Sequence, residues 1–416
     1  MHLIYNIGVR FYFLVIYLAS FFNSKAKLWI DGRKDQTFVD LNGCIWFHFA
    51  SLGEFEQGRP VLEQLKLKNS ENKIVITFFS PSGYEIRKNT PLADAVYYLP
   101  LDTKANAIYF IDALQPKMAV FTKYEYWYHF FDETHKRNIP LYIISGIFRP
   151  GQVFFKWYGS LHREMLGFVS HFFVQDEKSK ALLQQLGITN TTISGDTRFD
   201  RVWANAQQPK EIAFINDFRN GKKTFIAGST WPQDEQLIAD LATQFPDWKF
   251  IIAPHEISEE KIQKLISLLP GDSTTRYSQL SLLTGSEANL KSQISSLKSI
   301  VIDNIGMLSS LYQYGEIAYI GGGFGAGIHN TLEAAAFGLP VIFGPNYSKF
   351  KEAKDLIALQ AGFSIANEAA LKAVTEGFIK NDAHKVAGEK AKAYVKTHTG
   401  ATAIIINHIE KETPEA

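Results

Sequence analysis

The sequence has one cysteine, Cys44, among its 416 residues, so neither an intrachain disulfide nor a cysteine zinc cluster can form. Charge of one sign is also lacking, because Lys and Arg number 43, Asp and Glu number 42, and the formal net charge is +1. No strong overall field is available to hold a nucleic acid by its phosphates. The chain contains no Walker A motif, no fixed-period repeat and no Asp-x-Asp pair. A metal ion held by such a carboxylate pair is therefore not expected.

The composition indicates an ordinary globular protein. Hydrophobic residues make up 46% of the chain and charged residues 20%, which excludes a disordered or fibrous protein. The length suggests two or three domains. Aromatic residues reach 14% and are most conspicuous near the N-terminus.

The N-terminal segment is apolar and aromatic. The stretch 3–22 contains Arg10 as its one charged residue and is long enough in principle to span a bilayer. Arg10 would be costly in hydrocarbon, and the apolar run that follows it is too short for a comfortable span. Basic residues come next, as in a shallow anchor that meets anionic headgroups. We predict a membrane anchor over residues 1–30; the alternative is a helix buried against the protein's own core.

From residue 43 onward, short β-rich runs alternate with helical stretches, which is typical of βαβ units and a mostly parallel sheet. The expected strands are 44–50, 73–79, 95–98, 118–121, 141–144, 171–174 and 192–194, and then 224–227, 249–253, 299–302, 317–320 and 340–343. A polar helical stretch separates the two series at residues 201–222, and a final helical stretch runs from about residue 352 to the end. We predict an α/β fold with two Rossmann-like, doubly wound domains that face a central cleft.

The predicted boundaries are an anchor at 1–30, an N-terminal domain at 31–205 and a C-terminal domain at 206–416. The last helix could cross back to the N-terminal domain. The carboxyl ends of the strands are the ligand face of each such sheet.

Four candidate side chains, in three turns, follow strands of the first series. Ser51 and Glu54 have the spacing of a capping box, in which Glu54 only satisfies the first amides of its helix. Its place after a strand also suits a general base, if burial raises its pKa. Ser80 before Pro81 marks a helix start, whose free amides could hold an anion. Glu125, beside Trp127, could be an acid, an orienting group or a sugar contact.

A glycine-rich turn follows the strand at 317–320 and leads into a helix. Such a turn allows a phosphate to approach the backbone closely. Asn330 can cap that helix, and Glu333 can either cap or accept hydrogen bonds from a ribose. The turn fits a loose dinucleotide fingerprint, but it follows a late strand and lacks an acidic residue about 20 positions further on, so we discount NAD.

Two other turns of the second half carry candidate ligands. Ser229 and Thr230 can cap a helix and face an anion. His255, after the next strand, could donate to a phosphate, although a lone histidine is often structural.

Seven strings in this order resemble the 3-deoxy-D-manno-octulosonic acid (Kdo) transferases, membrane-anchored GT-B glycosyltransferases of lipopolysaccharide assembly. The resemblance runs from the N-terminal anchor to about residue 360. Its strings are Phe47-His-Phe-Ala-Ser-Leu-Gly-Glu54, Thr77-Phe-Phe-Ser-Pro-Ser-Gly83, Tyr98-Leu-Pro-Leu-Asp102, Glu125-Tyr-Trp127, Gly195-Asp-Thr-Arg-Phe-Asp200, Gly306-Met-Leu308 and His329-Asn-Thr-Leu-Glu333. Arg198 stands where the family usually has lysine, Met307 replaces a glutamate, and an arginine is missing before Pro254 and His255.

The resemblance implies a GT-B fold and an inverting transfer of Kdo from CMP-Kdo to a lipid A precursor, lipid IVA. It implies that Glu54 is the general base and that Glu125 and Arg198 stabilise the transition state. The implied donor-binding residues are Ser229, Thr230, Pro254, His255, Gly306, Met307, Leu308, His329, Asn330, Thr331, Leu332 and Glu333. We place Ser51, Gly53 and Ser80 among the acceptor-binding residues.

We expect catalysis without a metal or other cofactor, with fixed protein donors stabilising the leaving CMP. The expected partners are CMP-Kdo, a lipid A precursor and the membrane surface, with no nucleic acid. The expected location is the cytoplasmic face of the inner (cytoplasmic) membrane. Two rival functions are a sugar-nucleotide 2-epimerase of similar build, which needs no anchor, and a non-catalytic membrane-bound sugar-nucleotide binder, which needs neither Glu54 nor Glu125.

Overall fold

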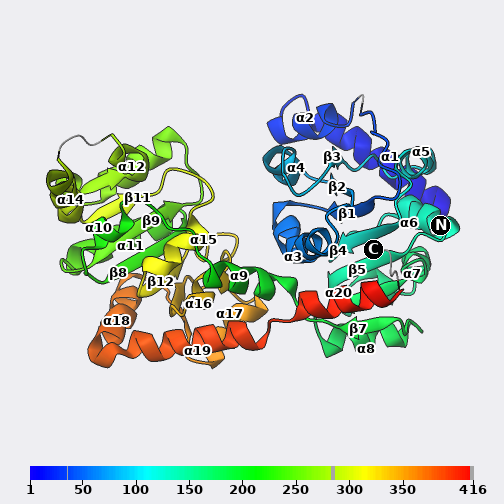
Figure 1. Ribbon diagram of the computed structural model, residues 1–416. Coiled ribbons are helices and arrows are strands. Elements are labelled where there is room, and N and C mark those ends of the chain that lie inside the picture. Colours follow the sequence, from blue (N-terminus) through cyan, green and yellow to red (C-terminus); the bar gives the residue numbers. More distant parts are fainter. Residues whose placement is uncertain (35, 283–285, 413–416) are drawn as a thin grey trace. The chain divides into compact units, whose positions relative to one another are not determined.

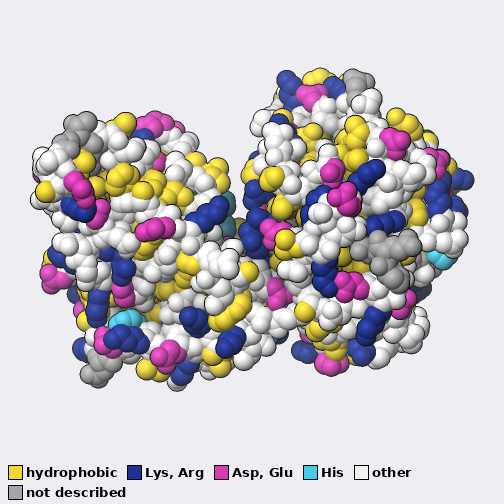
Figure 2. Space-filling model, viewed as in Figure 1, with side chains coloured by type: hydrophobic (Ala, Val, Ile, Leu, Met, Phe, Trp, Pro, Cys, Tyr) yellow, Lys and Arg dark blue, Asp and Glu magenta, His cyan; other side chains and the backbone are white. Residues whose placement is uncertain are grey.

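The computed structural model describes residues 1–34, 36–282 and 286–412 (Figure 1). The chain divides into two compact units. The first comprises Met1–Arg201 together with His398–Ala416, and the second comprises Val202–Thr397. Acidic and basic side chains are interspersed on the surface shown in Figure 2, in keeping with the balanced charge of the sequence.

Within the described residues, the first unit contains one seven-stranded parallel sheet with the order β3-β2-β1-β4-β5-β6-β7. Its strands are β1 (Ile45–Phe49), β2 (Ile74–Phe78), β3 (Ala95–Tyr98), β4 (Met118–Thr122), β5 (Leu141–Gly146), β6 (His171–Val174) and β7 (Thr191–Ile193). All seven strands predicted for this half are present. Four of them are buried along their whole length, which explains their nearly continuous apolar sequences.

Helices cover both faces of this sheet. They are α1 (His2–Ala19), α2 (Ser24–Asp31), α3 (Leu52–Lys68), α4 (Pro81–Arg87), α5 (Lys104–Leu114), α6 (Tyr128–Lys136), η1 (Val153–Phe155), α7 (Ser160–Gly167), α8 (Glu177–Gln185) and α20 (Ala401–Glu412). Helix α9 (Thr197–Gln207) runs from the first unit into the second. Asp200 on α9 accepts hydrogen bonds from Gly400 N (2.6 Å) and Thr402 N (2.7 Å). These two bonds hold the start of α20 in the first unit.

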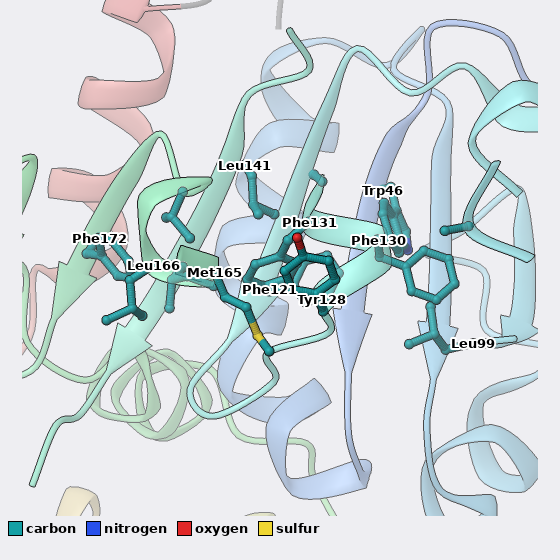
Figure 3. Close-up of a cluster of buried hydrophobic side chains, with 14 of the residues drawn as sticks. Trp46, Leu99, Phe121, Tyr128, Phe130, Phe131, Leu141, Met165, Leu166 and Phe172 are labelled. Carbon is teal, nitrogen blue, oxygen red and sulfur yellow. The ribbon is translucent and has the colours of Figure 1, made fainter. Parts of the chain in front are cut away.

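The alternation of side chains along β1 builds two cores. Ile45, Phe47 and Phe49 pack with α3 and with isoleucines of α20 on one face. Trp46 points to the other face, where its ring centroid lies 4.9 Å from that of Phe121. Figure 3 shows this second cluster, in which aromatic rings from β1, β4 and α6 meet.

The second unit also contains one seven-stranded parallel sheet among its described residues, with the order β10-β11-β9-β8-β12-β13-β14. Its strands are β8 (Thr224–Thr230), β9 (Lys249–Pro254), β10 (Thr274–Arg276), β11 (Ser299–Val301), β12 (Ile317–Ile320), β13 (Val341–Phe343) and β14 (Gly362–Ser364). The sequence did not predict the two edge strands β10 and β14. Each is three residues long and partly exposed, so neither has a hydrophobic run that could indicate it.

The helices of the second unit are α10 (Ile215–Arg219), α11 (Pro232–Gln244), α12 (Glu259–Leu268), η2 (Gly271–Ser273), α13 (Tyr277–Leu280), α14 (Glu287–Ser296), α15 (Leu308–Leu311), η3 (Tyr312–Tyr314), α16 (Leu332–Ala336), α17 (Lys351–Ala358), α18 (Glu368–Ile379), η4 (Lys380–Asp382) and α19 (Ala383–Thr397). The final helical stretch predicted from about residue 352 onward is wrong at one place. Strand β14 interrupts it and pairs with β13, and α20 then belongs to the first unit.

Candidate active site

The first sheet has its topological switch point between β1 and β4, where ligands of open α/β sheets usually bind. Glu54 lies just past β1, at the start of α3, and Lys123, Tyr124 and Glu125 lie just past β4. The structure therefore brings Glu54 and Glu125, both predicted as site residues, to the same edge of one sheet. Both side chains are partly buried.

Glu54 is held by the backbone in front of its own helix. Its Oε2 atom accepts a hydrogen bond from Ala50 N at 2.5 Å. The capping box predicted with Ser51 is wrong, because the Ser51 side chain makes no cap hydrogen bond. Burial and the nearby negative charge of Glu125 raise the pKa of Glu54 to about 7, although the Ala50 hydrogen bond and the positive charge of Lys123 oppose the shift. A carboxyl group with this pKa can exchange a proton near neutral pH.

Glu125 is held by two ring N–H groups. Its Oε2 atom lies 3.2 Å from His48 Nε2 and 3.0 Å from Trp127 Nε1. His48 is fully buried within β1, and its Nδ1 atom lies 2.8 Å from Thr77 Oγ1. The network thus joins β1, β2 and the turn after β4.

The hydrogen bonds of Thr77 assign the tautomer of His48. Thr77 Oγ1 accepts the Trp46 Nε1 proton at 2.8 Å, and its own hydroxyl proton has two acceptors. His48 Nδ1 is the nearer at 2.8 Å, against 3.3 Å for the Phe47 carbonyl oxygen. With Nδ1 as acceptor, the imidazole proton is on Nε2 and points at Glu125. Burial lowers the pKa of His48, so the ring is neutral.

Arg198 lies near the start of α9, and a buried carboxylate holds it. Its Nε atom lies 2.9 Å from Asp196 Oδ2, and Gln57 Nε2 donates to Asp196 Oδ1 at 2.6 Å. Burial acts to raise the pKa of Asp196, but the positive charges of Arg198 and Lys123 outweigh it and leave that pKa lowered. Arg198 is therefore a fixed cation at the same edge as Glu54.

The three predicted acceptor-binding residues lie near this edge. Ser51 is half-buried and Gly53 is exposed, both at the start of α3. Ser80 follows β2 and accepts a hydrogen bond from Ser82 N at 3.2 Å. It caps α4 with Pro81 at the first helical position, so the predicted helix start is confirmed.

The second sheet has its switch point between β8 and β12, and the glycine-rich turn follows β12. Two of its glycines are needed for backbone packing. A Cβ at Gly321 would lie 2.2 Å from Ser229 O, and one at Gly323 would lie 2.6 Å from Gly344 Cα. Asp234 on α11 fixes the turn by accepting a hydrogen bond from Gly322 N at 2.9 Å.

The prediction that Ser229 and Thr230 cap a helix is wrong. Both belong to β8, and Trp231 occupies the N-cap position of α11. Ser229 has a φ of 54°, in the left-handed region, and Thr230 Oγ1 donates to Glu235 at 3.3 Å. This turn bends the end of β8 so that Trp231 becomes partly exposed.

His255 and His329 come together beside Trp231. The His255 ring stacks on Trp231 with centroids 4.8 Å apart and on His329 with centroids 4.4 Å apart. Trp231 Nε1 donates to His329 Nε2 at 3.0 Å. Burial and the proximity of His255 lower the pKa of His329 to about 4, so His329 is neutral at pH 7. Pro254 ends β9 next to this stack.

The remaining predicted donor residues lie at the starts of two short helices. Helix α16 begins at Leu332 after Thr331, and Asn330 Oδ1 accepts the Leu332 N–H at 3.1 Å. Asn330 Nδ2 donates to Glu333 Oε1 at 3.0 Å, so Asn330 caps the helix from one position further out than expected. Gly306 and Met307 precede α15, and Leu308 is its first residue. The Leu308 side chain packs so closely on Gly228 that a Cβ atom there would lie 2.9 Å from Leu308 Cδ1.

Helix α1 is long and apolar enough, by length and composition, to cross a membrane. One side of it contacts the first unit. The Tyr5 hydroxyl donates to buried Asp102, and Asn6 Oδ1 lies 2.6 Å from His129 Nε2. The other side leaves large apolar residues exposed, among them Leu3, Ile7, Leu14 and Leu18. The predicted alternative of a helix buried in the core is wrong, because none of the residues of α1 is buried.

Comparison with known proteins assigns the first unit. The sequence profile of the family described as 3-deoxy-D-manno-octulosonic-acid transferase (kdotransferase) matches residues 23–201. Over these residues the chain is similar to the Kdo transferases. It is 27% identical to the enzyme of that name from Chlamydia trachomatis serovar A over 92% of this chain and 89% of the relative. It is 25% identical to the enzyme of the same name from Aquifex aeolicus, over 81% of this chain and 86% of that relative. These homologues indicate a glycosyltransferase.

Another relative is longer than this chain. A bifunctional glycosyltransferase/methyltransferase from Fusobacterium nucleatum is 26% identical over 83% of this chain, which spans 54% of that relative.

Solved structures confirm the predicted fold class. UDP-GlcNAc 2-epimerase from Neisseria meningitidis has a TM-score of 0.60 at 14% identity, over 88% of this chain and 100% of that one. MurG from Acinetobacter baumannii has a TM-score of 0.53 at 11% identity, over 88% of this chain and 99% of that one. The Kdo transferase homologue therefore has a GT-B fold of two Rossmann-like units. The epimerase likeness concerns the fold alone.

Sequence reasoning missed four residues of these arrangements: His48, Thr77, Asp196 and Trp231. His48 and Thr77 carried a signal, since each is a polar side chain inside an otherwise apolar strand. Asp196 stands in the Gly195–Asp200 string, two residues before Arg198. Trp231 gave no signal, because only the turn at Ser229 places it beside two histidines.

Proposed function

We propose that this Kdo transferase homologue moves Kdo from CMP-Kdo to a lipid A precursor, lipid IVA, with inversion at the anomeric carbon. The single observation that carries the mechanism is the position of Glu54 beside Glu125 at the switch point of the first sheet, where burial raises the pKa of Glu54. The names of the relatives and the matching family profile support the donor sugar.

In this mechanism Glu54, as a carboxylate, accepts the proton of an acceptor hydroxyl. The hydroxyl oxygen forms a bond to the anomeric carbon of Kdo, on the face opposite the CMP group. The bond between that carbon and the phosphate oxygen breaks, and CMP leaves with the electron pair. Glu54 later releases its proton to solvent. A general base of this kind typically contributes about 10²–10⁴-fold to the rate.

The other residues of the edge serve this step by charge. Glu125 raises the basicity of Glu54 and, as a fixed carboxylate, can stabilise positive charge that develops on the sugar ring. Arg198 is a fixed cation for the carboxylate or leaving phosphate of the donor. Ser51, Gly53 and Ser80 contact the acceptor.

We assign donor binding to the second unit. Twelve residues make up this proposed donor site: Ser229, Thr230, Pro254, His255, Gly306, Met307, Leu308, His329, Asn330, Thr331, Leu332 and Glu333. Backbone N–H groups and side-chain donors hold the CMP phosphate, so no metal is required. Neutral His329 fits hydrogen bonding better than ion pairing. The protein acts at the cytoplasmic face of the inner membrane, with the exposed apolar side of α1 as anchor.

The test is to incubate the purified full-length protein with CMP-Kdo and lipid IVA. We expect release of CMP together with a lipid whose mass has increased by one or more Kdo units. CMP release without a lipid product, or no reaction, would contradict the proposal. A UDP-GlcNAc epimerisation assay on the same preparation addresses the rival function that shares the fold.

A further inference from the structure

Arg33 is a partly buried cation at the carboxyl edge of the first sheet. Its Nε atom donates to Leu99 O at 2.8 Å and one terminal nitrogen donates to Phe79 O at 2.8 Å. Phe79 and Leu99 are the first residues after β2 and β3. The guanidinium therefore lies at the same edge of the sheet as Glu54 and Glu125.

The partners of this cation among the described residues are uncharged. Its other terminal nitrogen donates to Trp29 O at 3.0 Å, and its guanidinium carbon lies 3.7 Å from the ring centroid of Trp29 and 4.8 Å from that of Tyr98. Within residues 1–34, 36–282 and 286–412, no carboxylate forms an ion pair with it, and two of its five N–H groups have no acceptor. Burial lowers the pKa of Arg33 to about 9, so it remains charged at pH 7.

A second unsatisfied donor lies beside it. Trp29 is 4% exposed, and its Nε1 atom has no hydrogen-bond partner among the described residues. A buried N–H without an acceptor costs about 1–3 kcal/mol. The surroundings of Trp29 thus hold a cation with two spare N–H groups and an indole N–H without a partner.

The position of these donors indicates where an anion would come from. On α1, the ring centroids of Tyr12 and Phe13 lie 6.0 and 6.4 Å from the ring centroid of Trp29. The same helix exposes its apolar side, so these donors lie at the base of the anchor. On their other side Phe79 stacks on Trp127 at 4.9 Å, and Trp127 donates to Glu125. The rings of Phe79 and Trp127 therefore lie between this position and the proposed catalytic carboxylate Glu125.

We propose that Arg33 and Trp29 bind a phosphate group of a membrane lipid. Arginine suits this ligand because its planar fork offers two parallel N–H groups to phosphate oxygens. The identity of this lipid rests on the proposed function: it is the acceptor. Its phosphate, bound at this site, orients the sugar hydroxyl toward Glu54. An anionic phospholipid headgroup has the same chemistry and is the other source to be tested.

The experiment uses Arg33→Gln and Trp29→Phe in the full-length protein. We expect Arg33→Gln to lower kcat/KM for phosphorylated lipid IVA by about 10–100-fold, and to change it by less than about twofold for the enzymatically dephosphorylated lipid. Trp29→Phe should lower kcat/KM for the phosphorylated lipid alone, by about 3–10-fold, while Tm stays equal or rises because an unsatisfied donor is removed. Arg137→Gln is the matched control, since Arg137 pairs with Glu133 and Asp112 in the same unit.

Sedimentation with phosphatidylcholine vesicles, with and without phosphatidylglycerol, tests the second source without any turnover. If the variants lose only the preference for phosphatidylglycerol, the site binds bulk headgroups. If both variants lower kcat/KM equally for the two acceptors and keep the vesicle preference, the residues are structural and the inference is wrong. A wild-type protein that is inactive on both acceptors would refute the proposed function, and the vesicle arm would still decide whether the site binds phosphate.

Discussion

The Nε2 atom of His48 lies 3.2 Å from Oε2 of Glu125, inside a network that also fixes the other ring nitrogen against Thr77. His48 itself is fully buried and does not reach the sheet edge. It therefore acts through Glu125, as a positioning residue for that carboxylate.

Two substitutions separate the two bonds of His48. Glutamine can replace the Nε2 donor, whereas asparagine reaches only the position of Nδ1. We expect His48→Gln to retain most of the turnover and His48→Asn to lower kcat by about 10–100-fold, the effect of one hydrogen bond to a charged group. The measurement is kcat alongside Tm. Equal kcat losses in variants of equal Tm would mean that the contact with Glu125 is not important.

Glu54→Gln tests the general base. Glutamine has nearly the same shape but cannot take a proton. We expect turnover to fall by about 10²–10⁴-fold while Tm and CMP binding stay near normal. Glu63→Gln is the control, since Glu63 is a partly buried carboxylate of the same helix that pairs with Arg59. Turnover near the wild-type value in Glu54→Gln would move the base elsewhere, with Glu125 as the next candidate.

The pKa of Glu54 predicts the pH dependence of activity. Because the base must be a carboxylate, kcat/KM should increase as pH rises and reach half of its plateau near pH 7. Glu125→Gln removes one of the charges that raise this pKa, so the midpoint should move to lower pH even though the plateau also falls. A midpoint that stays in place would mean that Glu125 does not act on Glu54.

The same pKa shift predicts a change in stability. A carboxyl group whose pKa is higher in the folded than in the unfolded state binds more protons when folded, so its contribution to the free energy of unfolding falls as pH rises from about 4.5 to 7. The Glu54→Gln variant lacks this pH-dependent contribution to the free energy of unfolding. The Tm of the variant relative to wild type should therefore increase across that window, which thermal unfolding at several pH values can measure.

Activity should persist in excess EDTA, because the proposed donor site uses protein N–H groups in place of a metal. The measurement is product mass with pre-formed CMP-Kdo, so that no metal-dependent synthesis step is coupled to it. Complete loss that magnesium restores would contradict the proposal.

Membrane attachment should depend on the exposed side of α1. Deleting residues 1–22 should release the protein from membranes, but it also removes the Tyr5 partner of buried Asp102. Leu14→Glu with Leu18→Glu changes only side chains that are 48% and 54% exposed. We expect this double variant to keep its Tm and lose sedimentation with vesicles. Gln64→Glu with Asn69→Asp, which adds the same charge elsewhere on the first unit, controls for charge alone.

The sequence by itself determined the two parallel sheets, since buried strands leave apolar runs between helical stretches. It also determined which turns carry Glu54, Glu125 and Arg198, because polar residues after such strands lie at one edge. The short edge strands β10 and β14 and the return of α20 to the first unit have no local pattern, and only pairing with neighbouring segments decides them.

Tertiary structure alone decided the electrostatics of the site. The pKa of Glu54 depends on burial and on Glu125, which is 71 positions away, and the tautomer of His48 depends on a threonine of the next strand. The helix caps expected at Ser229 and Thr230 failed because β8 continues through both residues. Sequence spacing identifies the side chains that can do chemistry, and packing sets which of them carry a proton.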